Sequence, residues 1–432
     1  MTAFWKLPPH LPAGDQTIEA PGSVLLPGLI NAHTHLGVSP LGRGLVEDRD
    51  SRRVPFYMAI AAVTSIAYEP DFAAELHALM AAELAGLIRS GVTTVVSTNA
   101  AEVGWLLGAL DAAGIRAYAG PIVPSVPQAR GITDDTGQAV RLAATAEQLR
   151  ADIATARALH QQYDQGPAGR LRVLVGPASA ETCPDPFLVE LADLNRQWGV
   201  PLTLHLAQSD YDVAEAQRRF GGSSARHLHD LGILGPNLIA AHGSLLSEDD
   251  LALLRQAGAS IAHCASRKAK EGVFSPFQRY VEQGVRVVLA TDAFTTDFIE
   301  EVRWAAVLGK LAFGSTARPT AASTLAAATL EAAAALGRAD LGRIAPGLKA
   351  DLTLVDLTNL FVAPVRDPNR LACLLRLRPR GEPRLGRRPA AGTRRAPSPR
   401  WTARQWPTVL AVLPSASGTS PAGGGRLQFE HR

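Results

Sequence analysis

Short apolar runs alternate with longer segments of helical pattern over most of this chain, and this alternation restricts the fold most. The runs are rich in Val, Ile and Leu and lie directly before His33 and at residues 93–97, 115–123, 171–176, 201–205, 237–242, 259–263 and 285–292. Strands separated by helices pair in parallel, and runs without polar alternation suit a sheet covered on both faces. Eight strand-helix units predict an α/β fold, a (β/α)8 TIM-type barrel. A doubly wound open sheet is the alternative, although no glycine-rich dinucleotide loop follows the first strand.

Residues 71–91 show the helical pattern between two of these runs. Apolar side chains recur at helical spacing and are expected to form one buried stripe that contains Phe72, Leu76, Leu79, Leu84, Leu87 and Ile88. Gly91 is expected to end the helix, because glycine adopts the left-handed conformation that commonly follows a last helical turn.

Polar side chains stand at the ends of most of the apolar runs. They are His33, His35, His205, His242, His263 and Asp292. In a parallel barrel the carboxyl ends of all strands open on one face, where the active sites of this architecture lie. Neutral imidazole and carboxylate bind divalent metals, and three or four such ligands with an open position are typical of a catalytic site. Residues i and i+2 of an extended segment share a face, so His33 and His35 can approach one ion. Taken singly, His205 suits a barrel interior and Asp292 a helix cap, but the whole set predicts a metal site.

Five motifs follow one another in a specific order: PGLINAHTHLG (27–37), HLAQ (205–208), AAHGSLLSEDDL (240–251), IAHCAS (261–266) and ATDAF (290–294). Together they resemble the amidohydrolase superfamily, most of all the branch with cytosine deaminase, guanine deaminase and the triazine chlorohydrolases. The resemblance extends from about Pro27 to Leu360. It implies a (β/α)8 barrel with a small β-sandwich built from both chain ends.

The resemblance also implies roles for the site residues. One divalent metal ion, zinc or alternatively iron, would be held by His33, His35, His205 and Asp292. His242 would orient the attacking water and steady the developing oxyanion, while Asp292 would also take the proton of the water. Binuclear members of the superfamily bridge two metals with a carboxylated lysine at the end of strand four. Because no lysine occurs between Lys6 and Lys268, a single metal is predicted.

Two residues are expected to bind substrate. Deaminases of this branch carry an acid three residues after the strand-five histidine, where this chain has Gln208. Glutamine cannot act as a general acid, but it can hydrogen-bond a substrate carbonyl or amide. Asp210, Asp212 and Glu215 are the candidates for a replacement acid. For His263, a buried hydrogen bond is the alternative to lining the substrate pocket.

Residues 28–340 are therefore expected to form the barrel, and residues 1–27 and 341–371 the two parts of the small β-sandwich. Only 32 residues precede His33, fewer than in members of the superfamily, so the sandwich is expected to be incomplete. Residues 372–432 form an Arg-, Pro- and Gly-rich tail of low complexity, where no strand or helix is expected. The composition of this tail suggests a frameshift in a GC-rich gene as a hypothesis.

Composition argues against several classes of function. The net charge is only +3, and twelve arginines lie between Arg376 and Arg432 without the aromatic or amphipathic pattern of a nucleic-acid or membrane-surface binder. The three cysteines are scattered, and the chain shows neither a signal peptide nor an apolar run of about 18 residues. A cytoplasmic protein with no nucleic-acid or membrane partner is expected.

The sequence thus predicts a mononuclear metal-dependent hydrolase that cleaves a non-peptide C–N bond of a small cyclic amidine or amide, as aminohydrolases and chlorohydrolases do. The alternative is an impaired relative that binds metal and ligand without turnover, a reading that Gln208 favours. A homo-oligomer is expected from the resemblance only.

Overall fold

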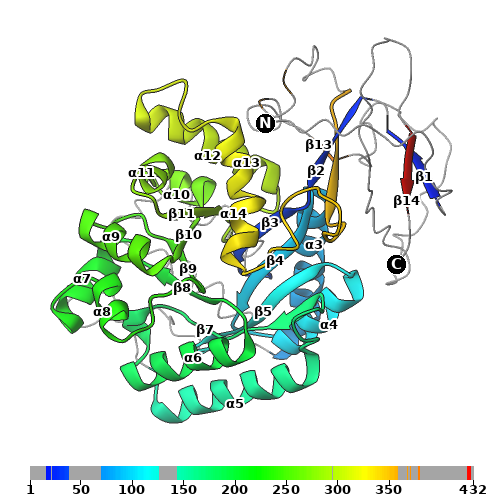
Figure 1. Cartoon of the computed structure of the whole chain (residues 1–432). Helices are drawn as coiled ribbons and strands as arrows, with labels where there is room; N and C mark the ends of the chain where they lie inside the picture. The colour runs from blue at the N-terminus through cyan, green and yellow to red at the C-terminus, as the bar shows by residue number, and fades with distance from the viewer. Residues whose placement is uncertain are drawn as a thin grey trace.

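Nine strands build a curled parallel sheet in the computed structural model of this chain (Figure 1). The structure describes residues 16–20, 22–37, 70–125, 144–293 and 295–358, together with 367, 370, 378–379 and 426–429. The strands are β3 (Leu29–Thr34), β4 (Val92–Asn99), β5 (Arg116–Val123), β6 (Leu171–Val173), β7 (Gly176–Pro177), β8 (Leu202–Leu206), β9 (Leu238–His242), β10 (Ser260–His263) and β11 (Arg286–Leu289). Because β6 and β7 share one of the predicted runs, these strands match the eight runs of the sequence.

Two isolated parallel bridges join the ends of this sheet. One half has the order β3-β4-β5-β6, with β7 also paired to β5, and the other half has the order β8-β9-β10-β11. The bridge Ser179–His205 connects the halves on one side, and the bridge Thr34–Asp292 connects them on the other. The strands therefore follow one another around a ring. The predicted α/β class with a parallel sheet is confirmed, and the ring is consistent with a TIM-type barrel.

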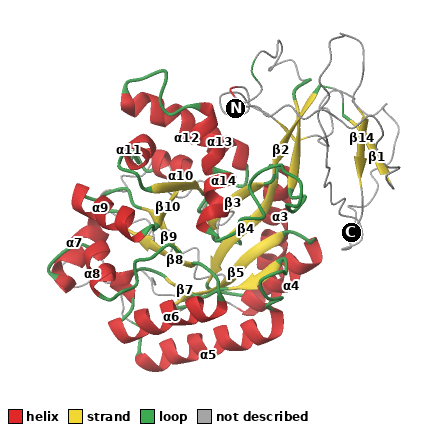
Figure 2. Ribbon diagram, in the orientation of Figure 1, coloured by secondary structure: helices red, strands yellow, loops and turns green. Residues whose placement is uncertain are grey.

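Helices cover the outside of the ring (Figure 2). They are α3 (Ala73–Arg89), α4 (Val103–Ala113), α5 (Ala146–Tyr163), α6 (Asp185–Trp198), α7 (Asp210–Phe220), α8 (Ser224–Asp230), α9 (Glu248–Ala257), α10 (Ala265–Lys270), α11 (Phe277–Glu282), α12 (Phe298–Phe313), α13 (Ala321–Ala327) and α14 (Leu330–Ala335). Short 3-10 turns occur at Pro70–Phe72 and Ala180–Thr182. No helix within the described ranges combines the length and the apolar character that crossing a membrane requires.

The helix predicted in residues 71–91 is α3, and its buried face differs from the prediction in one turn. Leu76, Leu84 and Leu87 are buried as expected, whereas Met80 takes the buried position that was predicted for Leu79. The helix ends at Arg89, and Gly91 follows with a φ of +91°. A side chain at Gly91 would be strained in this conformation, which explains the glycine.

The two ends of the chain meet in antiparallel pairs outside the ring. Strand β12 (Leu352–Asp356) pairs with β2 (Ser23–Pro27) on one side and with β13 (Arg378–Pro379) on the other. Strand β1 (Gln16–Glu19) pairs with β14 (Arg426–Phe429). Strand β12 lies within residues 341–371, the segment expected to contribute to the small β-sandwich. By contrast, β13 and β14 lie in the tail, where the sequence predicts no strand, because the pairing partners are supplied by distant segments.

Candidate metal centre

Three histidines and one aspartate converge at the carboxyl ends of the strands. His33 lies in β3 and His35 directly after it, His205 lies in β8, and Asp292 follows β11. Each side chain offers one ligand atom, and these four atoms all lie within 4.8 Å of one another. Residues far apart in the sequence thus meet on one face of the ring, as the strand-end pattern predicts.

Hydrogen bonds to the backbone orient two of the imidazole rings. Nδ1 of His35 lies 2.7 Å from the carbonyl oxygen of Thr98, and Nδ1 of His205 lies 2.6 Å from that of Ala178. A carbonyl oxygen can only accept, so both Nδ1 atoms carry the proton and both Nε2 atoms carry a lone pair. The two Nε2 atoms face each other at 3.1 Å. A cation between them would turn two opposed lone pairs into two ligands, and such outer hydrogen bonds are typical of metal-binding histidines.

His33 and Asp292 complete the set. His33 is 1% exposed, and neither of its ring nitrogens has a hydrogen-bond partner among the described residues. Oδ1 of Asp292 lies 3.7 Å from Nε2 of His33 and 3.4 Å from Nε2 of His35. Buried polar atoms without partners are costly, so a ligand is expected to satisfy them. The residues present therefore fit a divalent ion that takes nitrogen and oxygen ligands.

Burial keeps the imidazoles of His35 and His205 neutral, which is the form that binds metals. It lowers the pKa of His35 to about 4, with a further contribution from His33. Burial, followed by His33 and His35, also holds the pKa of His205 well below its usual value. For Asp292 burial acts in the opposite direction, but the neighbouring His33, His242 and Arg267 outweigh it and hold the pKa well below its usual range. The aspartate is therefore ionised at neutral pH.

The backbone is strained at three strand ends of the site. Ala207, His242 and Asp292 have φ angles of +45°, +73° and +55°, in the left-handed region that non-glycine residues rarely adopt. Such strain persists only where the surrounding structure fixes it, and it clusters at functional sites. Nε2 of His242 lies 3.9 Å from Oδ2 of Asp292, so His242 lies directly beside the cluster.

His242 is a neutral base beside the cluster of three histidines and one aspartate. Its ring is fully buried and stacks on the ring of His205 with the centroids 5.4 Å apart and the planes 13° apart. Burial and, next, the charge of Lys268 hold the pKa of His242 well below its usual value. A neutral imidazole can accept a hydrogen bond from water on one nitrogen and donate on the other.

The two residues predicted to bind substrate have different surroundings. Gln208 follows β8 and is half-buried, and its main-chain oxygen accepts a hydrogen bond from Lys268 at 3.0 Å. His263 is buried, its Nδ1 lies 3.1 Å from the hydroxyl of Ser275, and its ring packs against Phe277. The buried hydrogen bond left open for His263 is thus present, and contact with substrate stays a prediction for both residues.

Sequence reasoning missed Arg267, Lys268 and Glu271, which follow β10. Nε of Arg267 lies 3.1 Å from Oδ2 of Asp292, and Arg267 also pairs with Glu271. Nζ of Lys268 lies 2.9 Å from Oε2 of Glu271. All three side chains are at most 6% exposed. The sequence signal that could have found them is the adjacent pair Arg267 and Lys268, which begins three residues after the motif IAHC. This pair lies in the segment that follows a strand end at the carboxyl face of the barrel.

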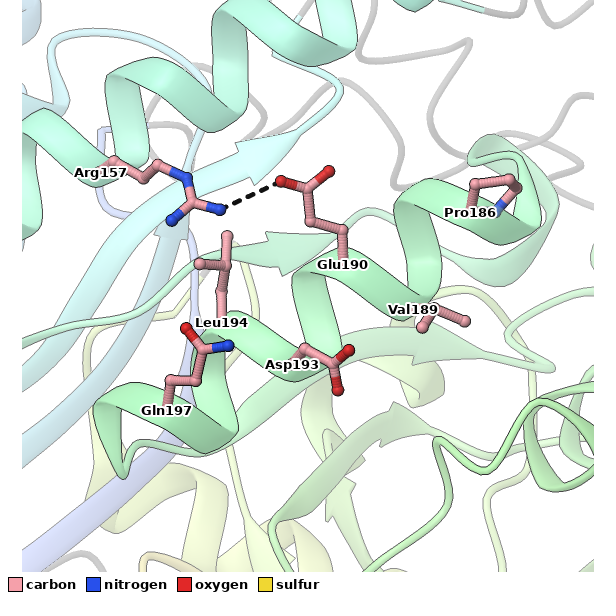
Figure 3. A pocket seen from close by; sticks show the side chains of 7 residues that line it. All are labelled: Arg157, Pro186, Val189, Glu190, Asp193, Leu194 and Gln197. Atoms are coloured by element: carbon pink, nitrogen blue, oxygen red, sulfur yellow. Dashed lines mark hydrogen bonds and ion pairs between the residues drawn. The ribbon is translucent and has the colours of Figure 1, made fainter.

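A groove on the outer surface does not belong to this site. It has a volume of about 280 Å³ and lies against α5 and α6 (Figure 3). Arg157 and Glu190 point toward one another across it and form an ion pair of 3.2 Å. Its lining contains neither a histidine nor a strand-end residue.

The chain matches a known protein family and is similar in sequence to several named enzymes. The sequence model of the Amidohydrolase family matches residues 24–379. The 5'-deoxyadenosine deaminase of Methanosarcina mazei is 29% identical over 367 residues, which cover 82% of this chain and 78% of the relative. A 5-methylthioadenosine/S-adenosylhomocysteine deaminase of Syntrophobacter fumaroxidans is 31% identical over 82% of this chain and 76% of the relative.

Solved structures show the same architecture. An adenosine deaminase from Xanthomonas campestris with bound zinc has a TM-score of 0.69 at 27% identity, covering 82% of this chain and 76% of that chain. An atrazine chlorohydrolase from Arthrobacter aurescens TC1, complexed with zinc, has a TM-score of 0.68 at 21% identity, covering 82% and 80%. At this identity, the similarity to the atrazine chlorohydrolase shows a shared fold.

Proposed function

Because the chain belongs to the amidohydrolase family, we propose that it is a metal-dependent hydrolase of a non-peptide C–N bond in a small cyclic amidine or amide. The observation that carries this proposal is the buried cluster of three histidines and one aspartate, whose ligand atoms lie within 4.8 Å of one another. The relatives support the reaction type, because they are named as deaminases.

His33, His35, His205 and Asp292 would hold one divalent ion, with zinc as the expected metal and iron as the alternative. The zinc bound to the Xanthomonas relative supports zinc. A bound divalent ion would supply a water whose pKa is lowered to about 7 and would polarise the carbon under attack. A single ion is supported by the lack of any lysine between Lys6 and Lys268.

The side chains around the ion would guide the water and its proton. Asp292 is ionised and would accept the proton of the attacking water. The neutral ring of His242 would orient this water and donate a hydrogen bond to the oxygen that develops negative charge. Gln208 and His263 would contact the substrate, Gln208 through its amide and His263 through its ring.

The substrate class follows from the relatives and from Gln208. The named relatives deaminate adenosine-type nucleosides, so an amino group on a nitrogen heterocycle is the proposed leaving group. Gln208 favours a second candidate, a relative that binds metal and ligand without turnover, because an amide cannot protonate the leaving group as an acid does.

We also propose that residues 28–340 form the barrel and that residues 1–27 and 341–371 contribute to a small β-sandwich. The pairing of β2 with β12 supports this division, because it joins the two segments.

Metal content and ammonia release test the proposal. Zinc in the wild-type protein, measured by plasma mass spectrometry after gel filtration, is expected at about one equivalent per chain. The double variant His33→Ala, His35→Ala should lose this zinc, whereas the control His229→Ala should keep it, because the His229 side chain is 48% exposed and pairs with Asp230. Ammonia release from 5'-deoxyadenosine, adenosine and guanine would establish turnover. Folded protein without zinc would contradict the metal site, and zinc without ammonia would favour the binding-only candidate.

A further inference from the structure

A lysine from another element contacts Gln208, the residue at the position where related deaminases carry an acid. Lys268 lies in α10, which follows β10, and its Nζ donates to the main-chain oxygen of Gln208 after β8. In the sheet, β9 lies between β10 and β8. The Lys268 side chain therefore reaches across the carboxyl end of β9, which carries His242. This places the ammonium group beside the site.

Two hydrogen bonds fix the position of the Lys268 ammonium group. It donates to the oxygen of Gln208 at 3.0 Å and to Oε2 of Glu271 at 2.9 Å. A lysine ammonium has three N–H donors, so one donor has no partner among the residues that the structure describes. The side chain is only 2% exposed, so bulk water does not surround this group. Burial lowers the pKa of Lys268, and the neighbouring Glu271 opposes this shift and favours the charged form.

With a divalent ion bound, the site would carry an excess of positive charge, which favours an anionic ligand. Arg267 and Lys268 are balanced by Asp292 and Glu271, which they contact. A bound divalent ion would add two positive charges, and Gln208 adds no negative charge where an acid would. The carboxyl group of Glu301 is hydrogen-bonded to Ser266, two residues before Lys268, and burial raises its pKa to about 7. A neutral substrate would leave this buried excess of positive charge uncompensated, which is costly at low dielectric.

We propose that Lys268 is a substrate-binding residue that selects heterocycles with an oxo group or a deprotonated ring nitrogen next to the carbon under attack. The free N–H of Lys268 would donate to this acceptor. Charged hydrogen bonds of this kind are roughly twice as strong as neutral ones. The inference rests on the proposed function of the site and narrows its substrates from amino heterocycles in general to acidic amino-oxo heterocycles.

Two triazines that differ only in such groups test the inference. Ammelide carries one amino and two oxo groups and an acidic ring N–H, whereas melamine carries three amino groups. Calorimetric titration of the zinc-loaded protein should show that ammelide binds at least about tenfold more tightly than melamine. This measurement does not require turnover, so it separates the inference from the proposed reaction, which ammonia release tests.

Variants on one helix assign the effect to Lys268. The change Lys268→Met removes the donor at similar length and should abolish the preference for ammelide, whereas Lys268→Arg keeps a cation and should retain part of it. The control Lys270→Met lies on the same helix, where Lys270 is exposed, and should leave the preference unchanged. Because the ratio of two affinities is measured within each folded variant, a loss of stability does not imitate the result. Equal affinity of both triazines for the wild-type protein, failure of ammelide to bind, or an unchanged preference in Lys268→Met would overturn the inference.

Discussion

Burial sets the protonation of one carboxyl group in this protein, that of Glu301. Glu301 in α12 is fully buried, and it accepts hydrogen bonds from the amide and the hydroxyl of Ser266 at the start of α10. Burial raises its pKa to about 7, although these hydrogen bonds favour the ionised form. The carboxyl group thus remains protonated to higher pH in the folded than in the unfolded chain.

This shift predicts a dependence of stability on pH. Between pH 4.5 and 7 the folded state binds more protons at Glu301 than the unfolded state, so this residue lowers the free energy of unfolding as the pH rises. The change Glu301→Gln removes this loss. Relative to the wild type, the variant should gain about 3 kcal/mol between pH 4.5 and pH 8. Urea denaturation at both values measures this, and a constant difference between the two proteins would contradict the prediction.

At the scale of elements, the strands and their polar ends were predictable, and the contacts between elements were not. Apolar runs bounded by helices define parallel strands, and the rule that strand ends meet on one face brought His33, His205 and Asp292 together. The exchange of Leu79 for Met80 on the buried face of α3 depends on how the helix rotates against the sheet. The reach of Lys268 across β9 depends on the path of α10, which local sequence does not encode.

Strand β5 makes a close approach that only glycine permits. A Cβ atom on Gly120 would lie 1.8 Å from the main-chain oxygen of Leu174, whereas one on Gly108 in α4 would meet nothing within 4 Å. Backbone of the ring cannot give way as a side chain can. The change Gly120→Ala should therefore cost more than about 3 kcal/mol, above the usual range for overpacking.

The control Gly108→Ala should instead stabilise the protein by about 0.5–1 kcal/mol, because alanine favours a helix interior. Urea denaturation curves of the two variants should thus shift in opposite directions. Similar shifts would show that the approach of β5 to Leu174 is not tight.

At the scale of the whole molecule, one ion pair fastens the paired chain ends to the ring. Arg116 at the start of β5 donates to both carboxylate oxygens of Asp351, which precedes β12, at 2.8 and 3.1 Å. The side chains are 6% and 16% exposed. Two parallel bonds between buried charges are strong and leave a costly unpaired charge when one partner is removed.

The change Asp351→Ala should lower the free energy of unfolding by about 2–3 kcal/mol. The control is Glu190→Ala, which breaks the exposed ion pair with Arg157 on the outer helices and should cost less than about 1 kcal/mol. Denaturation of both variants at one salt concentration compares them. Equal losses would show that Asp351 does not fasten the chain ends.

The bridge between Thr34 and Asp292 has a consequence for biosynthesis. These residues are 258 positions apart, and His33 and His35 flank the first of them. During translation the two histidines are made long before Asp292, so the complete cluster of three histidines and one aspartate cannot exist on a growing chain until residue 292 has left the ribosome. Capture of a divalent ion by all four side chains would therefore be a late event, which would lock a ring that has already closed and would not nucleate it.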